Sequence, residues 1–480
     1  MTKKAFSGRR LLPALIIAAL LIAVCSAAYG VGGTGGAPSD TPNNILLSWT
    51  LDPTTTQTFT WHALGESYVE YATAGSNEFT RILGAATLVR TSVGGYYRYE
   101  ATATGLLPDT HYAYRIGTTD GGVTEPVAFT TAPIHADSFS FLYLGDLQIA
   151  NSMNTELTQW GQLLRAAYDR NPDLAFGIMG GDIVQSGLDL ANWTRFLEEA
   201  EPVFGTIPLL PTNGNHESNH IGGKPLAYTD VFALLRNGPT GFEEEFYSYD
   251  YGDVHFTVLN SWVYSSEQNL TPTDYARISD WIRDDLAESD ALWKVAILHH
   301  PPYALANDAV SALVKQNWVP IFEDAKLDLV FVGHQHVYAR SLPMYRGNTD
   351  YVNGIVYIMG VSGSKFYESA DETYMDTIVK QESNYQIIDV DSGQLTVTSY
   401  NAAEEVLDFA TIYPKARGGS AYSGDADGDG ELTYDDVLLT LAAIRQRDGF
   451  NRAMDANADG TVDIRDAQLI QSRIAEGSAA

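Results

Sequence analysis

The pattern of apolar and polar residues divides the chain into parts of different character. Between residues 44 and 131, short runs with strand-like alternation are separated by turn residues, which predicts a small β-sandwich. From Ser138 onward, apolar runs of strand length alternate with stretches of helical periodicity, which is typical of a layered α/β domain. After Ser423, two apolar helical stretches each follow an acidic segment. We therefore predict a multidomain chain with about three folding units.

The first unit, over residues 41–133, contains four strand candidates, and a turn at 107–110 precedes the last of them. The candidates are residues 45–49, 68–71, 96–102 and 111–116. This unit has no cluster of His or carboxylate residues, so we interpret it as a scaffold domain.

The second unit, over residues 138–412, is predicted to contain seven strands, two long helices and a closing hairpin. The strand candidates are residues 139–144, 175–179, 207–210, 254–259, 295–298, 329–332 and 355–359. The helices are predicted at 155–170 and 273–288, and the hairpin at 385–390 and 394–400. Ligands of such domains bind at the carboxyl ends of the strands, so polar residues at those ends are candidates for function.

The N-terminus predicts an exported protein. Basic residues at positions 3, 4, 9 and 10 precede an apolar run of 14 residues, 11–24, and small residues follow up to Ala28. Because about 20 apolar residues are needed to span a bilayer, we predict that residues 1–28 are a signal peptide and that the protein is secreted. A lipoprotein anchored through Cys25 is the alternative, although Ile22 and Val24 suit its motif poorly. Cys25 is the only cysteine, so the exported chain is expected to fold without disulfides.

The charge of the chain excludes some partners. Its 29 Lys and Arg oppose 60 Asp and Glu, which gives a net charge of −31. Nucleic acid and anionic membranes are therefore poor partners, and no segment after the signal peptide is predicted to span a membrane. Acidity often serves solubility, but here part of it is concentrated after Ser423, with 12 Asp or Glu against 5 Arg.

Five of the predicted strand ends carry residues that can bind metal ions. They are Gly145-Asp146-Leu147-Gln148, Gly181-Asp182, Gly214-Asn215-His216-Glu217, His299-His300 and Gly333-His334-Gln335-His336. Each motif alone is a weak signal, because a lone His or Gly-Asp is more often structural. Together they indicate a pair of metal ions, which can activate water and neutralise a phosphoryl transition state. The mixture of Asp, Asn and His suits Zn, Mn or Fe better than Ca or Mg.

As a set, these motifs resemble the calcineurin-like metallophosphoesterases and, among them, the purple acid phosphatases. The resemblance extends from Asn44 to Tyr413, and segment 333–340 is closely similar to the last motif of that family. The first unit resembles the N-terminal domain of those phosphatases, down to segment 106–112. The implied fold is a fibronectin type III-like β-sandwich followed by a central layered α/β metallophosphoesterase domain.

The resemblance also implies a role for each candidate ligand. Asp146 and His336 would bind the first metal, Asp182 would bridge, and Asn215, His299 and His334 would bind the second. His216 would be the general acid, which fits the need to protonate an alkoxide leaving group while a metal-bound hydroxide attacks phosphorus. Glu217 is expected to orient its loop. His300 and His220 are weaker candidates for contacts with the substrate.

Two departures from the family concern the first metal. Purple acid phosphatases have a Tyr three residues after the bridging Asp, and its bond to ferric iron gives their colour; here that residue is Gln185. Other members of the superfamily place His two residues after the first Asp, where this chain has Gln148. Gln148 could bind through its amide oxygen, a weaker ligand than phenolate or imidazole. We therefore expect a weaker or differently populated pair of divalent or mixed-valence Zn, Mn or Fe ions.

Residues 424–477 contain one acidic pattern twice, 30 residues apart. Oxygen side chains at loop positions 1, 3, 5, 9 and 12, with Gly at position 6, wrap a calcium ion. The expected ligands of two Ca²⁺ ions are Asp425, Asp427, Asp429, Thr433 and Asp436, and then Asp455, Asn457, Asp459, Asp463 and Asp466. Because one apolar helix follows each loop, the module resembles a small α-helical dockerin, which would bind a cohesin domain. Its recognition positions differ from the common pair, which leaves the cohesin class and a structural or adhesive calcium module open.

The sequence thus predicts a secreted acid phosphatase-like hydrolase of phosphate monoesters. After a linker at 413–423, its dockerin would attach it to a cohesin-bearing scaffold, as in a cellulosome. One alternative is a phosphodiesterase using the same site, because pocket loops decide between the two. The other is a non-catalytic, calcium-dependent binding protein with a decayed metal site, which the presence of Asp182 and His216 disfavours.

Overall fold

The computed structural model describes most of residues 41–415 and, separately, parts of 424–477. The described ranges are 41–91, 94–134, 136, 138–150, 158–218, 224–391, 393–415, 424, 426, 432–446, 454, 456 and 462–477. The predicted signal peptide, most of the linker, His220 and six of the ten predicted calcium ligands lie outside these ranges. Among the described residues, no helix combines the length and apolar character needed to cross a membrane.

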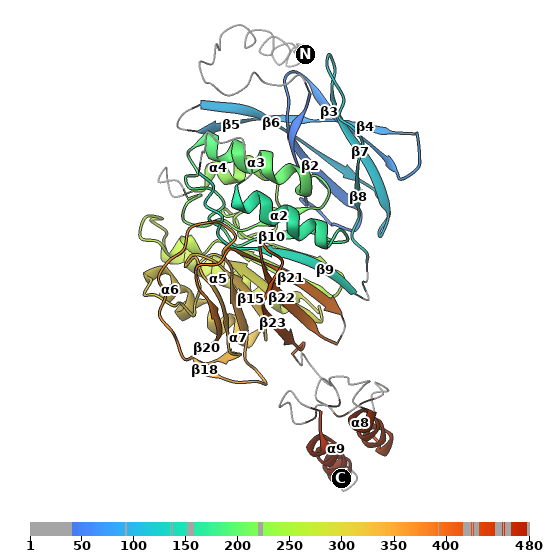
Figure 1. Cartoon of the computed structure of the whole chain (residues 1–480), viewed down its shortest axis with the longest axis vertical. Coiled ribbons are helices and arrows are strands. Elements are labelled where there is room, and N and C mark those ends of the chain that lie inside the picture. Colours follow the sequence, from blue (N-terminus) through green and yellow to red (C-terminus); the bar gives the residue numbers. More distant parts are fainter. Residues whose placement is uncertain are drawn as a thin grey trace, which may run out of the picture. The chain divides into compact units, whose positions relative to one another are not determined.

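Residues 43–130 form two four-stranded antiparallel sheets that share one core (Figure 1). The first sheet contains β1 (Asn43–Ser48), β2 (Thr56–His62), β6 (Gly94–Thr104) and β5 (Ala85–Thr91), in that order. The second contains β4 (Thr80–Leu83), β3 (Ser67–Thr73), β7 (His111–Thr118) and β8 (Val127–Thr130). Phe59 and Trp61 of the first sheet pack in the same cluster as Tyr114 and Phe129 of the second. This β-rich domain therefore has its own core, as a scaffold requires.

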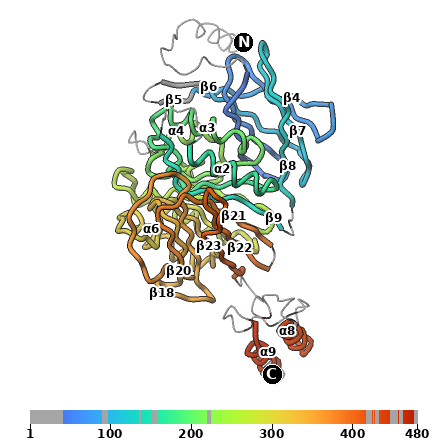
Figure 2. Tube along the Cα trace, in the orientation of Figure 1, coloured from blue at the N-terminus to red at the C-terminus, as the bar shows by residue number. Residues whose placement is uncertain are grey.

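The domain that follows contains two larger sheets. The six-stranded sheet has the order β11 (Leu209–Pro211), β10 (Gly177–Met179), β9 (Ser138–Leu144), β21 (Asn384–Asp391), β22 (Leu395–Asn401), β23 (Val406–Ile412). The seven-stranded sheet has the order β12 (Tyr247–Tyr251), β13 (Val254–Leu259), β14 (Trp293–Leu298), β15 (Leu329–Val332), β19 (Val356–Met359), β16 (Tyr338–Ser341), β20 (Met375–Val379). A small pair, β17 (Met344–Tyr345) and β18 (Asn348–Thr349), lies apart. In the trace of Figure 2, the late strands β21–β23 lie beside β9 although they are far from it in the sequence.

The alternation of side chains along the strands explains how the layers stack. Val295 and Ile297 of β14 belong to the core shared by both sheets, whereas Ala296 and Leu298 belong to a second core beneath helices. Because both faces of β14 are covered, all its residues are buried, and all but Lys294 are apolar. The helices are α2 (Gln159–Arg170), α3 (Leu190–Phe204) and α4 (Leu226–Val231) on one side, and α5 (Pro272–Glu288), α6 (Ala309–Asn317), α7 (Val319–Asp324) and the 3₁₀ helix η2 (Ser261–Tyr264) on the other.

Hydrogen bonds join the β-rich domain to the α/β domain. Tyr114 donates its hydroxyl to the carbonyl of Gly205 at 2.6 Å, and Ser48 donates to the carbonyl of Ala233 at 2.6 Å. Trp49, just after β1, is buried in the core of the α/β domain, where its ring lies 5.5 Å from that of Phe176. The two domains are therefore held together by a shared apolar contact as well as by polar ones.

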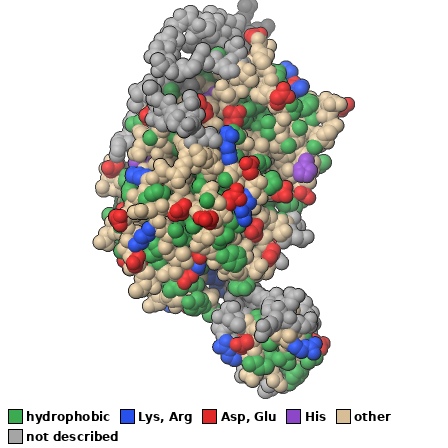
Figure 3. Space-filling model, viewed as in Figure 1, with side chains coloured by type: hydrophobic (Ala, Val, Ile, Leu, Met, Phe, Trp, Pro, Cys, Tyr) green, Lys and Arg blue, Asp and Glu red, His purple; other side chains and the backbone are tan. Residues whose placement is uncertain are grey.

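The C-terminal segment contains two helices, α8 (Tyr434–Gln446) and α9 (Ile464–Gly477). Val437 of α8 packs in one small cluster with Ala467 and Ile470 of α9. On the face shown in Figure 3, acidic and basic side chains are interspersed among apolar and neutral ones, which is ordinary for a surface exposed to water.

The buried side chain of His255 is expected to make the free energy of unfolding depend on pH. The imidazole of His255 lies 2.7 Å from Asp250 Oδ1 and 3.1 Å from Asp285 Oδ2. Burial alone would lower the pKa of His255, but hydrogen bonds to both carboxylates raise it to about 9. Since this pKa is above its unfolded value of about 6.5, the stabilisation is complete below pH 6.5 and is lost as pH rises through 9. We expect the free energy of unfolding to fall by about 1–3 kcal/mol over that interval.

Denaturant titrations at pH 6 and pH 10 would measure this loss, with His255→Gln as the comparison. The variant should lose the His255 contribution, so its free energy of unfolding should depend less on pH than that of the wild type. Equal pH dependence in the two proteins would show that His255 is not charged in the folded state.

Candidate metal centre

The five predicted strand ends meet in the structure at the edge where the two large sheets adjoin. The residues concerned are Asp146 after β9, Asp182 after β10, Asn215 after β11, His299 after β14 and His334 after β15. β9, β10 and β11 run parallel to one another, as do β13, β14, β15 and β19. Parallel strands place their carboxyl ends at one edge, so residues far apart in the sequence come together there.

The backbone of the centre is tightly constrained. A Cβ atom on Gly333 would lie 2.5 Å from Asp146 Oδ2, and one on Gly214 would overlap the carboxylate of Asp182. Asp182 itself has φ 50°, and His334 and His336 have φ 74° and 48°. Non-glycine residues rarely adopt this left-handed conformation, and its concentration in one place is typical of functional sites.

The first group of candidate ligands consists of Asp146, Asp182 and His336, all buried. His336 donates its Nδ1 proton to the carbonyl of Lys365 at 2.8 Å, which leaves the Nε2 lone pair 3.7 Å from Asp146 Oδ1. Within the described part of the chain, neither that Nε2 nor that Oδ1 has a hydrogen-bond partner. Two buried acceptors that face each other are costly unless a cation lies between them, so this group fits a metal ion.

The second group consists of Asn215, His299 and His334. Asn215 Oδ1 lies 3.2 Å from His299 Nε2 and 3.1 Å from His334 Nδ1. The other ring nitrogen of His299 lies 2.8 Å from the carbonyl of Gly180, which orients the ring. Asp182 is grouped with Asp146 and His336, and its Oδ2 is 3.3 Å from His299 Nε2, so this carboxylate lies between the two groups. Imidazole, amide and carboxylate ligands in this arrangement fit two transition metal ions.

The ionisation of these groups agrees with that interpretation. Burial raises the pKa of Asp146 to about 8, partly offset by His299. Burial would lower the pKa of His299, but the carboxylates, Asp182 foremost, raise it to about 10. Without metal, a proton on His299 therefore supplies the positive charge that these carboxylates require. Burial lowers the pKa of His334 and of His336 to about 4, so both are neutral at pH 7, as metal binding requires.

His216 lies at the opening of the centre. Its backbone N–H donates to Asp182 Oδ1 at 3.0 Å, and its Nδ1 proton is donated to the carbonyl of Gln185 at 2.6 Å. Nε2 is then left 3.9 Å from Asp182 Oδ2, with 22% of the side chain exposed. A protonated imidazole in this position can pass a proton from Nε2 to a bound leaving group.

The buried carboxylate of Glu217 fixes two of the loops. It accepts hydrogen bonds from the backbone N–H groups of Asp182 at 2.9 Å, Val184 at 3.0 Å and Gly214 at 2.7 Å. This single side chain therefore holds the loop after β10 against the loop after β11, as the sequence led us to expect of it.

Hydrogen bonds on both sides of its amide fix the orientation of Gln148. The amide oxygen of Gln148 lies 2.8 Å from Lys365 Nζ, and its amide nitrogen lies 3.0 Å from Asp182 Oδ2. The group that Gln148 presents to Asp182 is thus a donor, and ligation of a metal through its oxygen stays a prediction. His220 lies outside the described residues.

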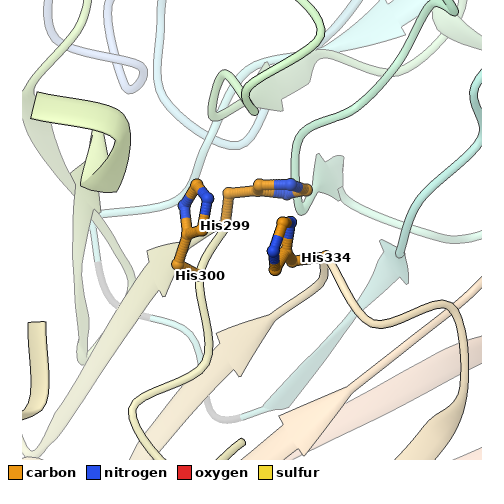
Figure 4. A group of neighbouring side chains, drawn as sticks. All are labelled: His299, His300 and His334. Atoms are coloured by element: carbon orange, nitrogen blue, oxygen red, sulfur yellow. The ribbon is translucent and has the colours of Figure 1, made fainter. Parts of the chain in front are cut away.

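The prediction that His300 contacts substrate stays a prediction, because its side chain lies behind the candidate ligand His334 rather than at the surface of the centre. The side chain of His300 is fully buried, because its ring stacks on Trp262 with centroids 5.5 Å apart. Its Nδ1 lies 2.8 Å from the hydroxyl of Ser261. Figure 4 shows its ring next to those of His299 and His334, and the centroids of His300 and His334 are 4.3 Å apart. His300 therefore packs against the candidate ligand His334. Its Nε2 has no hydrogen-bond partner among the described residues, and its imidazole belongs to the same group of possible metal-binding side chains as those of His299 and His334.

Comparison with known proteins agrees with this geometry. The family model described as calcineurin-like phosphoesterase matches residues 139–338, and that of the purple acid phosphatase N-terminal domain matches residues 42–131. The chain is 23% identical over 398 residues to purple acid phosphatase 23 of Arabidopsis thaliana, covering 74% of this chain and 84% of that protein. It is 27% identical over 270 residues to an uncharacterized protein of Mycobacterium tuberculosis, covering 51% of this chain and 50% of that protein.

A solved structure shows the same fold. The purple acid phosphatase isolated from yellow lupin (Lupinus luteus) seeds superposes with a TM-score of 0.65 at 17% identity, over 79% of this chain and 76% of that one. Both matched domains occur here in the same order, with the two ligand groups at the strand ends of the second. The chain is therefore a purple acid phosphatase-like, calcineurin-type metallophosphoesterase, and hence a metal-dependent phosphoesterase.

Proposed function

We propose that the chain hydrolyses phosphate monoesters with two transition metal ions held by the two ligand groups. The observation that carries this proposal is the position of Asp182, whose carboxylate belongs to the first group and lies 3.3 Å from His299 Nε2 of the second. A metal pair in this position would supply a nucleophilic water and neutralise charge on the phosphoryl oxygens. The name of the Arabidopsis relative, purple acid phosphatase 23, supports the same activity.

The residues of the chain would then divide the remaining work. His216 would donate a proton from Nε2 to the leaving-group oxygen, while the carbonyl of Gln185 holds its Nδ1 proton in place. Glu217 would keep the loops of Asp182 and Gly214 in register, since it accepts hydrogen bonds from both backbones. The buried side chains of Asp146 and His336 would hold the first ion.

The test is an assay of the full chain with a monoester and a diester, after chelation and after addition of Zn, Mn or Fe. We expect hydrolysis of the monoester with at least one metal and none after chelation. Hydrolysis of the diester alone would favour the phosphodiesterase alternative. Binding of the metals without hydrolysis of either ester would favour a decayed catalytic site.

The identity of the first metal leads to a spectroscopic prediction. Gln185 stands where coloured phosphatases carry Tyr, and its amide lies 3.3 Å from His216 Nδ1. We expect the iron-loaded wild type to lack the broad visible band, and Gln185→Tyr to gain it when loaded with iron. Absorption spectra of the two proteins at matched iron content would measure the difference.

Tyr367 provides the control for that experiment, because its ring centroid lies 4.3 Å from that of His336. A purple wild type that loses its colour in Tyr367→Phe would show that a phenolate from another loop reaches the iron. Our mapping of position 185 onto the family's tyrosine would then be wrong.

We further propose that the protein is secreted and attached to a cohesin-bearing scaffold by a calcium-loaded dockerin over residues 424–477. Support comes from the two described loop ends. The fully buried carboxylate of Asp436 accepts from the N–H of Ala426 at 2.6 Å and of Thr433 at 2.7 Å, and Asp466 accepts likewise from Asp463 at 2.8 Å. The same arrangement at position 12 of both loops is the one a repeated calcium loop requires.

An exposed apolar surface supports a partner for this module. Tyr434 and Leu438 lie one turn apart on α8 and are 58% and 62% exposed, and Ile464 at the start of α9 is 54% exposed. Large apolar side chains that a helix leaves in water are typical of a protein–protein interface.

The calcium prediction concerns folding. Several carboxylates in each loop repel one another until calcium neutralises them, so isolated residues 424–477 should be helical with calcium and largely unfolded with a chelator. Circular dichroism measures this directly, and Asp436→Ala should weaken the response. Identical spectra with calcium and with chelator would remove the physical basis of the dockerin proposal.

A further inference from the structure

Lys365 reaches the metal centre from outside the five predicted motifs. It lies in the loop after β19, and its ammonium group donates to Gln148 Oε1 at 2.8 Å. Gln148 Nε2 in turn donates to Asp182 Oδ2 at 3.0 Å. Because an ammonium group can only donate, the amide oxygen must face Lys365 and the amide nitrogen must face Asp182. A chain of hydrogen bonds therefore links Lys365 to the carboxylate of Asp182.

The backbone of this loop is fixed against the ligand loops. The N–H groups of Ser362 and Gly363 donate to the carbonyl of Asp146 at 3.0 and 2.7 Å. The carbonyl of Lys365 accepts the Nδ1 proton of His336 at 2.8 Å. The loop that carries Lys365 is thus hydrogen-bonded to the backbone of one candidate ligand and to the ring of another. These bonds hold the backbone of Lys365 in place.

The ammonium group of Lys365 has capacity for a further partner. It has three protons, of which Gln148 takes one. Among the described residues, no carboxylate forms an ion pair with it, although acidic side chains outnumber basic ones by 60 to 29 in the chain. Lys365 is exposed, and its Nζ lies 5.0 Å from the ring centroid of Tyr367. A cation beside the centre with donors to spare is suited to an anionic ligand.

We propose that Lys365 is a substrate-binding residue that contacts the phosphoryl oxygens and favours monoester dianions over diester monoanions. The inference rests on the proposed function, since it concerns the same site. A monoester dianion carries one more negative charge than a diester monoanion, and three of its phosphoryl oxygens are not bonded to carbon. An additional ammonium group therefore stabilises the bound monoester more than the bound diester.

The test uses the metal-loaded full chain with Lys365→Met, Lys365→Arg and the matched control Lys380→Met. Lys380 is a lysine of the neighbouring β20–β21 connection whose ammonium already pairs with Asp371 at 2.9 Å. Inorganic phosphate is the binding probe, followed by calorimetry, and metal content is measured in every variant. Kinetics with a monoester and a diester complete the comparison.

In Lys365→Met we expect the Kd for phosphate to rise about 10- to 100-fold, as for loss of a charged hydrogen bond. The value of kcat/KM for the monoester should fall by a similar factor, and that for the diester by less than about 3-fold. Lys365→Arg should recover most of the loss because it keeps the charge. Lys380→Met should behave as the wild type.

Equal losses for monoester and diester would overturn the proposal. So would an unchanged Kd for phosphate combined with altered metal content, because Lys365 would then only orient Gln148. Failure of the proposed function would be a distinct result. If the wild type hydrolysed neither ester but bound phosphate more tightly than Lys365→Met, the role of Lys365 in binding would stand while the proposed function failed. A metal-loaded wild type that does not bind phosphate would overturn it.

Discussion

Asp182→Asn is expected to lower kcat/KM for a phosphate monoester by about 10²- to 10⁴-fold, because metal ions contribute several kcal/mol to such reactions. The substitution keeps the size of the side chain but removes the charge of the carboxylate that lies between the two ligand groups. The backbone N–H of His216 donates to Oδ1 of this carboxylate, so the position of the general acid should also suffer. Steady-state kinetics and the metal content of the purified variant would measure both effects.

Asp389→Asn is a suitable control. Asp389 is an exposed carboxylate on β21 of the same sheet, and it accepts a hydrogen bond from Ser140 rather than facing the centre. The control should retain full activity and metal. If Asp182→Asn retained full activity with two bound metals, Asp182 would not be the bridging ligand.

His216→Gln is expected to slow hydrolysis by a factor that depends on the leaving group, because His216 is proposed to donate a proton to it. Loss of a positioned proton donor should slow hydrolysis of alkyl phosphates, whose leaving groups are poor, by about 10²- to 10⁴-fold. Nitrophenyl phosphate, whose leaving group needs no proton, should be slowed by less than about 10-fold. Metal content should be unchanged, because His216 belongs to neither ligand group.

The measurement is kcat for a series of monoesters of increasing leaving-group pKa. In the variant the rate should fall more steeply along the series than in the wild type. His111→Gln, which alters an exposed histidine of the β-rich domain, provides the control. A uniform loss for all esters would mean that His216 positions other groups and does not donate the proton.

The sequence was most informative where strands are buried on both faces. The bounds of β13 and β15 agree with the predicted 254–259 and 329–332, because apolar residues dominate both strands, interrupted in β13 by His255 and Thr257. The helix α5 also starts within one residue of its predicted start, since Thr271 and Asp274 form a capping box. Polar residues directly after such strands then located the two ligand groups.

Elements with mixed composition escaped prediction. The strand β2 is rich in Thr, and its polar side chains are buried in the folded sandwich, so the strand lacks the alternation of apolar and polar residues that sequence reasoning looks for. The helix α3 contains Pro202 and buries Glu199, and Arg195 pairs with that carboxylate. A buried ion pair within a helix breaks the amphipathic pattern on which sequence reasoning depends.

Within the metal centre, the orientation and burial of several side chains depend on contacts with residues far away in the sequence, which the motifs do not reveal. The amide of Gln148 is oriented by Lys365, which lies 217 residues away and belongs to no motif. The burial of His300 depends on Trp262 and Ser261, which are 38 and 39 residues away. Arg340, in the segment most like the family's last motif, binds Asp408 of β23 and so supports the sheet instead of the chemistry.

Metal titration of the chelated full chain shows whether the two ligand groups hold a catalytic metal pair. Bound Zn or Mn and hydrolysis of a phosphate monoester would be followed together, with calcium kept in excess so that the acidic tail does not compete for the added metal. We expect no hydrolysis at zero metal and a maximum at about two transition metal ions per chain. Full hydrolysis by a chain from which these metals have been removed would contradict this expectation.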